Sequence, residues 1–300
     1  MSNVGIDLGT TFTKTSINLI FPSGISNQIC MSNNILQVND KQYAMELFND
    51  KATYDTNINK SLNQNIKLNY IYALGKSTTG FEGYYENVIV GLPPSQWNNE
   101  NTVEKFKELL QVEDNLQIQI NGKPVKLYVE CLSIVPEDVP AYYAINYQQF
   151  AKQKVLLLGL GSLTLNQILF QNDEVIDMHT DELGVLKVFK DLAQEITSKT
   201  GYNVKMEDIH SILQYGFFIK GKQQDINNII TPIINKHCEI IYRNLKLKWS
   251  IDTIPFVLLL GGGGIALHNY ICKYIPHIIL LENAQTISVM GMGRMAGELY

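Results

Sequence analysis

Hydrophobic and polar residues alternate from Val4 to Leu8 and, after a Gly-Thr-Thr turn, from Phe12 to Leu19. A period of two residues is typical of a strand with one buried face, so this stretch predicts a β-hairpin. The plan recurs at 155–170, where VLLLGLGSLTLNQILF again reads as strand, glycine turn and strand. We therefore expect an internal duplication in which a hairpin opens each half of the chain.

The rest of the chain mixes helical patterns with buried strands. Asn121-Gly122 between two alternating runs predicts a hairpin turn. The apolar run IPFVLLL is followed by four glycines and a helical pattern, which predicts strand, turn and helix. Other helical patterns lie at about 98–111, 139–150, 184–201, 225–249 and 283–300. The first of these is expected to be capped near Asn101 or Thr102.

Length and charge narrow the class of protein. A chain of 300 residues is long enough for about two domains, and 45% hydrophobic with 18% charged residues is typical of a globular protein. The net charge of −5 argues against direct binding to DNA, which needs a basic face. We expect no signal peptide, because the chain starts directly on a strand pattern without a basic region or an apolar run. We expect no membrane segment, because the longest apolar run, 254–267, is short and contains a proline and four glycines. The four cysteines form no CxxC pair, which favours reduced thiols in the cytoplasm.

The first turn has the residue types that bind phosphate. Gly9 leaves backbone N–H groups unobstructed, and the hydroxyls of Thr10 and Thr11 add hydrogen-bond donors. Lys14 adds a positive charge for a terminal phosphate. Asp7 suits Mg²⁺, often through water. A glycine-threonine turn is common in proteins, so this turn alone favours simple packing over a ligand site.

Two further turns strengthen the phosphate interpretation. The second hairpin turns at Gly161 and Ser162, and the run of four glycines would place the N–H groups of a helix start against an anion. Other phosphate motifs fail: the segment ending in Gly75-Lys76-Ser77 lacks the first glycine of a P-loop, and GLGSLT lacks the last glycine of a dinucleotide motif.

In this order the motifs resemble the actin, heat-shock chaperone and sugar-kinase superfamily. IDLGTTFTK resembles its first phosphate loop, LGLGSLTLN its second, and LLLGGGGIALH its adenosine turn. Within that superfamily, VIVGLPPSQW, SIVPEDVPAYYA, LQYGFFIKGKQQDI and NAQTISVMGM resemble the bacterial actin-like ParM/StbA group that segregates plasmids.

The resemblance implies an α/β fold of two actin-like, ribonuclease H-like domains with a nucleotide cleft between them. Domain I would comprise 1–154 plus 285–300, with a small insert at about 24–80. Domain II would comprise 155–284, with an insert at about 182–250.

The same resemblance assigns roles to residues. Asp7 would hold Mg²⁺ through water, and Glu137 would polarise the attacking water. Without the resemblance, Glu137 could equally be a loop carboxylate placed favourably at a helix start. The residues implied to contact the nucleotide are Gly9, Thr10, Thr11, Lys14, Gly161, Ser162, Gly261, Gly262, Gly263 and Gly264.

One position departs from the family. The second phosphate loop usually carries an aspartate where this chain has Gly159, and Asn166 stands where another acidic residue is frequent. Loss of an electrostatic partner at such a site can lower a rate by about 10²–10³, so slow hydrolysis is expected.

The implied function is an ATPase, with ATP or alternatively GTP and Mg²⁺ as cofactors, that forms filaments in the cytoplasm. Its implied partners are further copies of itself and a DNA-bound adaptor of a partition system, with no direct contact to nucleic acid or membrane. Two alternatives stay open. One is a hydrolysis-poor scaffold, which Gly159 favours. The other is a small-molecule kinase, for which the sequence offers no convincing aspartate base.

Overall fold

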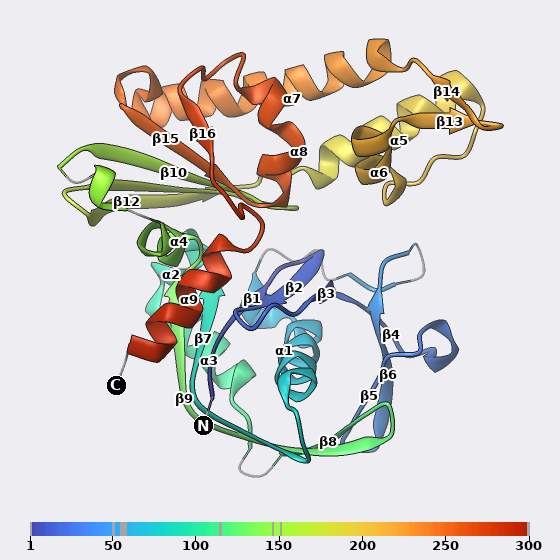
Figure 1. Cartoon of the computed structure of the whole chain (residues 1–300), viewed down its shortest axis with the longest axis vertical. Helices are drawn as coiled ribbons and strands as arrows, with labels where there is room; N and C mark the ends of the chain where they lie inside the picture. The colour runs from blue at the N-terminus through green and yellow to red at the C-terminus, as the bar shows by residue number, and fades with distance from the viewer. Residues whose placement is uncertain are drawn as a thin grey trace. The chain divides into compact units, whose positions relative to one another are not determined.

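The computed structural model describes residues 2–49, 52–54, 59–113, 116–145, 147–150 and 152–298. These residues form two compact units, each a sheet with helices packed on it, as expected for the predicted α/β class (Figure 1). The first unit comprises Met1–Gln149, Met178–Thr180 and Thr286–Tyr300, and the second comprises Phe150–Asp177 and Asp181–Gln285.

The first unit is built on a nine-stranded sheet. In order across the sheet, its strands are β3 (Ile20–Pro22), β2 (Phe12–Thr15), β1 (Ser2–Leu8), β7 (Glu82–Leu92), β9 (Lys123–Pro136), β8 (Leu116–Ile120), β5 (Ile35–Val38), β6 (Lys41–Leu47) and β4 (Gly24–Ser26). The predicted opening hairpin is β1 and β2, but its second strand ends at Thr15 rather than at Leu19. The chain turns through Asn18, which has φ of 64°, and returns as β3.

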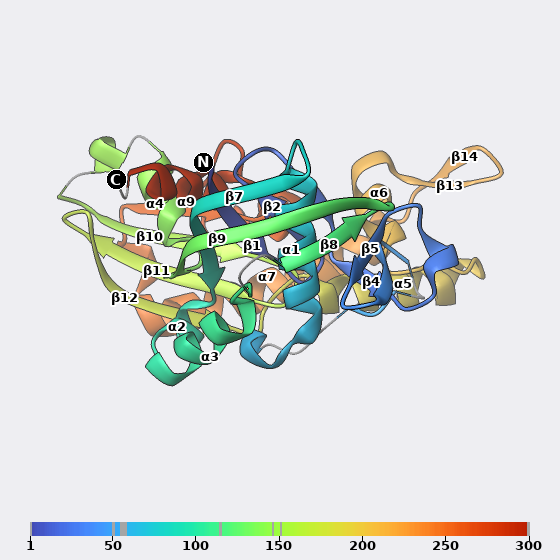
Figure 2. The same cartoon turned by 90° about the horizontal axis from the view of Figure 1, so that it is seen from below.

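Helices cover the sheet of the first unit. They are α1 (Gln64–Ser77), α2 (Pro94–Trp97), α3 (Glu100–Leu110), α4 (Val139–Ala144) and α9 (Ile287–Glu298), with short 3₁₀ turns η1 (Ile29–Met31) and η2 (Lys60–Leu62). The sheet curves around α1, which contacts β1, β2, β7, β8 and β9 (Figures 1 and 2). The segment 24–80, predicted as a small inserted lobe, contributes β4, β5 and β6 to this same sheet through the pairing of β5 with β8.

Two helix predictions need correction at their ends. Asn99, and not Asn101 or Thr102, caps α3, because its side-chain oxygen accepts a hydrogen bond from the backbone N–H of Thr102 at 3.1 Å. The pattern over 139–150 forms α4 and a separate 3₁₀ turn, η3 (Tyr147–Phe150), because the backbone of Ile145 is extended.

The second unit is built on a five-stranded sheet. Its order is β12 (Glu174–Asp181), β11 (Leu165–Gln171), β10 (Lys154–Leu160), β15 (Phe256–Leu260) and β16 (Ile278–Leu280). The remaining elements are α5 (Leu186–Thr200), α6 (Asp208–Tyr215), α7 (Asn227–Trp249), η4 (Ile251–Thr253), α8 (Gly262–Ile271) and the small ribbon of β13 (Phe217–Ile219) with β14 (Lys222–Gln224). None of the helices in the described part of the chain combines the length and hydrophobicity that crossing a bilayer requires.

The two sheets repeat one plan. The order β3-β2-β1-β7-β9 in the first matches β12-β11-β10-β15-β16 in the second. In both, the opening hairpin is antiparallel, and its first strand pairs in parallel with the strand that follows later in the chain. The duplication predicted from the hairpin sequences is therefore confirmed at the level of topology.

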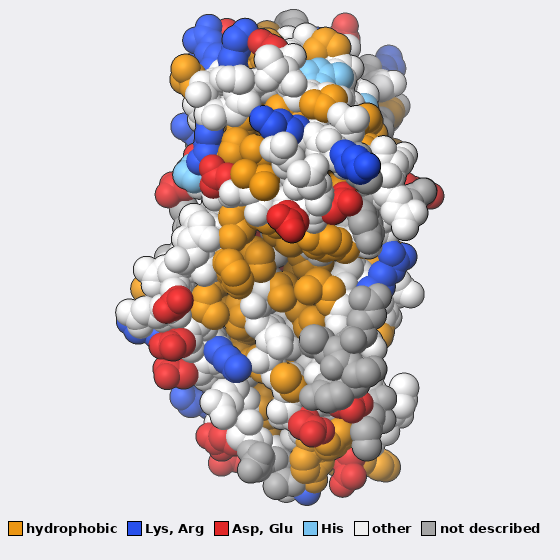
Figure 3. Space-filling view, turned by 90° about the vertical axis from the view of Figure 1, so that its left-hand side faces the viewer, with side chains coloured by type: hydrophobic (Ala, Val, Ile, Leu, Met, Phe, Trp, Pro, Cys, Tyr) orange, Lys and Arg blue, Asp and Glu red, His pale blue; other side chains and the backbone are white. Residues whose placement is uncertain are grey.

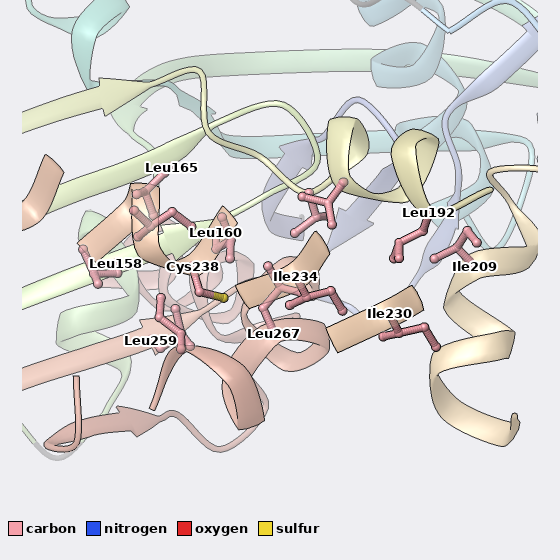
Figure 4. Packing of buried hydrophobic residues seen from close by; sticks show 14 of the residues in the cluster. Leu158, Leu160, Leu165, Leu192, Ile209, Ile230, Ile234, Cys238, Leu259 and Leu267 are labelled. Atoms are coloured by element: carbon pink, nitrogen blue, oxygen red, sulfur yellow. The ribbon is translucent and has the colours of Figure 1, made fainter. Parts of the chain in front are cut away.

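The core of the second unit lies where its helices meet the sheet. Leucines of β10 and β15 pack toward α7 and α8, and α5 and α6 add further apolar side chains (Figure 4). The labelled members of this cluster are Leu158, Leu160, Leu165, Leu192, Ile209, Ile230, Ile234, Cys238, Leu259 and Leu267. Leu259 is 0% exposed, so this strand is buried on the face that the helices cover.

We predict that Leu259→Ala lowers the free energy of unfolding of the second unit by about 2–5 kcal/mol, because it leaves a cavity in a close-packed core. Chemical denaturation followed by circular dichroism measures the change. Leu247→Ala is the matched control, since Leu247 lies in α7 of the same unit and is 86% exposed. An equal loss in both variants would contradict the placement of the core.

Candidate functional site

The first turn joins two strands whose facing residues carry opposite charges. Asp7 of β1 and Lys14 of β2 are direct register partners. Residues that face each other across antiparallel strands project to the same side of the sheet. The Lys14 Nζ atom lies 2.6 Å from the Asp7 Oδ2 atom. The structure therefore brings together two of the residues predicted for the phosphate site.

The turn itself is fixed by a glycine and a serine. A Cβ atom on Gly9 would lie 2.6 Å from the carbonyl oxygen of Phe12, so no other residue fits without movement of the backbone. The Ser23 hydroxyl donates to the Gly9 carbonyl at 2.6 Å, and the Ser23 N–H donates to the Thr11 carbonyl at 2.9 Å. Ser23 was not among the predicted site residues. Thr10 lies partly exposed within the turn.

Glu137 lies at the end of β9, where its N–H donates to the Leu92 carbonyl at 2.8 Å. Its carboxylate forms an ion pair with Lys60, whose Nζ atom also donates to the Leu8 carbonyl at 2.9 Å. The Lys60 and Glu137 side chains are only 10% and 12% exposed. Lys60 thereby links the predicted water-polarising residue to the strand end that precedes the first turn.

Sequence analysis missed Lys60. It lies in a polar segment without clear periodicity, 77 residues before Glu137, and no local motif marks it. The only signal would have been a lysine close to a helix start, which is too common to be informative.

The charges of this site stabilise one another. Burial raises the pKa of Asp7, but the ammonium groups of Lys14 and Lys60 more than offset this, so the pKa lies below its ordinary value. Burial lowers the pKa of Lys14, but the attraction of Asp7 and the hydrogen bond to it outweigh burial, so the pKa lies above its ordinary value. Both groups are therefore charged at neutral pH.

In the second unit, the turn at Gly161 and Ser162 is tied to the start of α5. The Gly161 N–H donates to the Thr164 carbonyl at 2.9 Å. The Gly161 carbonyl accepts from the Val185 N–H at 3.1 Å, and the Ser162 carbonyl accepts from the Leu186 N–H at 2.9 Å. These bonds fix the turn in a defined shape.

The glycine run lies beside that turn because β15 is the parallel neighbour of β10. Gly261 has φ of +92°, and a Cβ atom there would lie 2.3 Å from the Leu160 carbonyl oxygen. A Cβ atom on Gly263 would lie 2.8 Å from the same oxygen. Helix α8 then begins at Gly262 and continues through Gly264, so its first N–H groups lie at this turn, as the strand, turn and helix pattern predicted.

The two hairpins differ at one register position. Gly159 of β10 pairs with Asn166 of β11, just as Asp7 pairs with Lys14 in the first unit. The first hairpin thus carries a largely buried pair of charges, and the second carries a neutral pair at the equivalent place.

The Asp7 carboxylate, next to the first turn, suits a magnesium ion that is held mainly by phosphate. Mg²⁺ is usually bound by one or two carboxylates, by substrate phosphates and by waters. Within the described ranges, no three acidic, histidine or cysteine side chains gather as a metal site. Asp7 is the carboxylate at the first turn and would hold the ion through water.

Residues 5–139 match the family model of the N-terminal domain of actin-like proteins. Residues 157–272 match a second family model, which describes the C-terminal part of the MreB-like archaeal actin homologue. Comparison with curated proteins gave no match.

Similar solved structures cover nearly the whole chain. The archaeal actin homologue Ta0583 in complex with ADP has a TM-score of 0.81 and 18% identity over 100% of both chains. A 15-stranded ParM filament from Clostridium botulinum has a TM-score of 0.78 and 17% identity over 100% of both chains. The actin-like protein Alp7A has a TM-score of 0.77 and 13% identity, covering 98% of this chain and 95% of its own.

The Asp7–Lys14 pair predicts a specific dependence of stability on pH. The pKa of Asp7 is below 3.8 when folded, so its contribution is present above that pH and is lost as the pH falls through the folded value. The pKa of Lys14 is above 10.5 when folded, so its contribution is present below that pH and is lost as the pH rises through the folded value. Relative to the Asp7→Asn/Lys14→Met double variant, the wild type should lose stability only in acid and in strong alkali.

Denaturation at a series of pH values measures this difference. Lys14→Met alone should cost about 3 kcal/mol at neutral pH, because it leaves a buried carboxylate without this partner. Lys246→Met, which removes the exposed ion pair with Asp252, should change little. A wild-type stability that tracks the double variant at every pH would show that the pair contributes nothing.

Proposed function

The chain is an actin-like protein with the two-domain actin fold, and from this premise we propose that it binds a nucleoside triphosphate and polymerises in response. The observation that carries this proposal is the first turn of the first unit. There, a glycine-threonine turn joins the two strands that carry the largely buried Lys14–Asp7 pair, and Lys60 links Glu137 to the Leu8 carbonyl before the turn. Backbone N–H groups, hydroxyls and an ammonium are the groups that bind phosphate oxygens.

We propose ATP as the nucleotide, with GTP as the alternative that a binding experiment would decide. In the first unit, Gly9, Thr10, Thr11 and Lys14 would bind the β- and γ-phosphates. In the second unit, the phosphate contacts would come from Gly161 and Ser162, and the contacts to the α-phosphate and adenosine from Gly261, Gly262, Gly263 and Gly264. The ADP bound to the archaeal actin homologue supports an adenine nucleotide. A magnesium ion held by Asp7 through water would neutralise phosphate charge.

Hydrolysis in this proposal depends on Glu137. Its carboxylate accepts a proton from a water molecule as the water oxygen bonds to the γ-phosphorus. The bond from that phosphorus to the bridging oxygen breaks, and the nucleoside diphosphate leaves with the electron pair. The neutral pair at Gly159 and Asn166 gives less electrostatic support than an aspartate would, so we expect slow turnover.

The polymer would be a filament of a DNA-segregation system. Two of the solved structures with this fold are filaments, of ParM and of Alp12. Figure 3 shows hydrophobic side chains gathered in several places on one face, a feature of protein–protein contact surfaces. Lys and Arg on that face lie in small separate groups (Figure 3), and the net charge is −5. A DNA-bound adaptor protein, rather than the filament itself, would therefore contact the plasmid.

A hydrolysis-poor scaffold is the second candidate. The observation that favours it is the same neutral pair, Gly159 with Asn166. It predicts a filament that assembles with the nucleotide and then persists.

We predict that adding Mg-ATP to the purified protein raises light scattering, and that phosphate release and decay of the scattering follow. Simultaneous recording of both signals tests the proposal. A lasting rise with little phosphate would favour the scaffold. Bound nucleotide with no rise at any protein concentration would refute filament formation.

The role of Glu137 is tested in the same assay. Glu137→Gln should slow phosphate release by about 10²–10⁴ while assembly continues, because the amide cannot accept the proton. Glu130→Gln is the matched control, since Glu130 is an exposed carboxylate on the same strand, β9. Equal rates for wild type and Glu137→Gln would remove Glu137 from the mechanism.

A separate prediction concerns Gly159. Gly159→Asp should increase phosphate release by roughly tenfold or more, because it restores a carboxylate beside the second turn. Gly159→Asn, which adds similar bulk without charge, should give no increase. If neither variant differs from wild type in phosphate release, the missing aspartate does not limit the rate.

A further inference from the structure

Ser23 is a buried polar residue beside the first turn, and the proposed mechanism does not use it. It lies between β3 and β4 and is 6% exposed. Its hydroxyl donates to the Gly9 carbonyl at 2.6 Å, and its N–H donates to the Thr11 carbonyl at 2.9 Å. One residue outside the hairpin therefore binds the carbonyl groups on both sides of Thr10.

The proton of the Ser23 hydroxyl has a defined direction. The Thr13 Oγ1 atom lies 3.0 Å from the Ser23 Oγ atom, and either hydroxyl could donate in this bond. A hydroxyl carries one proton, and the Ser23 proton is used on the Gly9 carbonyl, so Thr13 must be the donor. The result is a chain of hydrogen bonds from Thr13 through Ser23 to Gly9, in which each bond strengthens the next.

The backbone at Ser23 is held from two other directions. Its carbonyl accepts a hydrogen bond from the Asn69 side chain of α1 at 2.9 Å, and Asn69 is 4% exposed. The next residue, Gly24, lies so close to β6 that a Cβ atom there would be 2.2 Å from the Leu47 carbonyl oxygen. Because α1 and β6 fix its backbone, Ser23 is a rigid anchor for the first turn.

The anchored carbonyl groups decide where the N–H groups of the turn point. In a planar trans peptide, which is the form of every described peptide bond, the C=O and N–H bonds point in opposite directions. The Gly9 carbonyl points to Ser23, so the Thr10 N–H points away from it. The Thr11 carbonyl also points to Ser23, so the Phe12 N–H points away as well. Ser23 is buried and the turn residues are partly exposed, so both N–H groups face the side that an anion can reach.

We propose that Ser23 is a positioning residue for phosphate binding, and this inference rests on the proposed nucleotide function. It acts through the turn rather than by touching the nucleotide. By holding two carbonyl groups, it aims the Thr10 and Phe12 N–H groups at the β- and γ-phosphates, and donors that are already oriented bind without a cost for ordering them. Without the Ser23 hydroxyl, the peptide between Gly9 and Thr10 can rotate, and an oriented donor is lost from the phosphate site.

The dependence of affinity on the β-phosphate tests the proposal. Fluorescent ADP is bound to the full-length protein with Mg²⁺, at protein concentrations below those that scatter light, and is displaced by unlabelled ADP or AMP. Ser23→Ala should weaken ADP binding by ~10-fold, because an oriented hydrogen bond to a charged group is lost. AMP lacks the β-phosphate, so its affinity should change by less than about twofold. If the protein selects guanine, GDP and GMP take their places.

Thr15→Val is the matched control. Thr15 is another buried hydroxyl of the same hairpin, and it accepts a hydrogen bond from the Leu19 N–H at 3.2 Å, away from the first turn. Both Thr15→Val and Ser23→Ala lose a buried hydrogen bond, so both should lower the midpoint of thermal unfolding. Only Ser23→Ala should change the ratio of ADP to AMP affinity. A purely structural role would lower the number of binding sites and leave that ratio at its wild-type value.

The outcomes separate this inference from the proposed function. Equal weakening of ADP and AMP by Ser23→Ala, or no weakening of either, overturns the positioning role and leaves nucleotide binding intact. The same loss of the ADP preference in Thr15→Val also overturns it, because any lost buried hydroxyl would then suffice. A wild type that binds no adenine or guanine nucleotide overturns both the positioning role and the proposed function.

Discussion

Compensation of buried charge is the constraint on which the first unit depends. Two carboxylates and two ammonium groups lie at the end of β1, paired as Asp7 with Lys14 and Glu137 with Lys60. Removing an ion from water costs several kcal/mol, so each of these groups needs its partner. The four residues come from β1, β2, the end of β9 and the turn before α1. The charges are therefore compensated only when all four segments are in place.

Close backbone packing brings the end of the chain to the same strand. A Cβ atom on Gly5 of β1 would lie 2.5 Å from the Cβ atom of Met292, and one on Gly293 would lie 2.3 Å from the Cβ atom of Ser16. Helix α9 can lie this close to β1, and to Ser16 just after β2, only because a glycine makes each contact. Ser288 of the same helix accepts a hydrogen bond from the Asp138 N–H at 3.2 Å, next to Glu137. The C-terminal helix thus packs against β1 and holds the residue that follows Glu137.

The repeated plan of the two units makes their difference informative. Both hairpins keep the glycine turn and the parallel neighbour strand, which are what backbone binding of phosphate needs. Only the first keeps charged residues at the register pair below the turn. The two hairpins therefore share their backbone plan and differ in the charge of the residue pair below the turn.

The sequence by itself determined the features that depend on neighbours in the chain. Alternation predicted the hairpins, Asn121-Gly122 predicted the turn between β8 and β9, and the four glycines predicted the start of α8, because each pattern acts over a few residues. Element ends were less accurate: Asn99 and Asn101 are equally good caps in isolation, and packing selects between them. Only the tertiary structure decided that Lys60 lies at Glu137, since a contact between residues 77 positions apart is set by how the sheet curves and by the need of a buried charge for a partner.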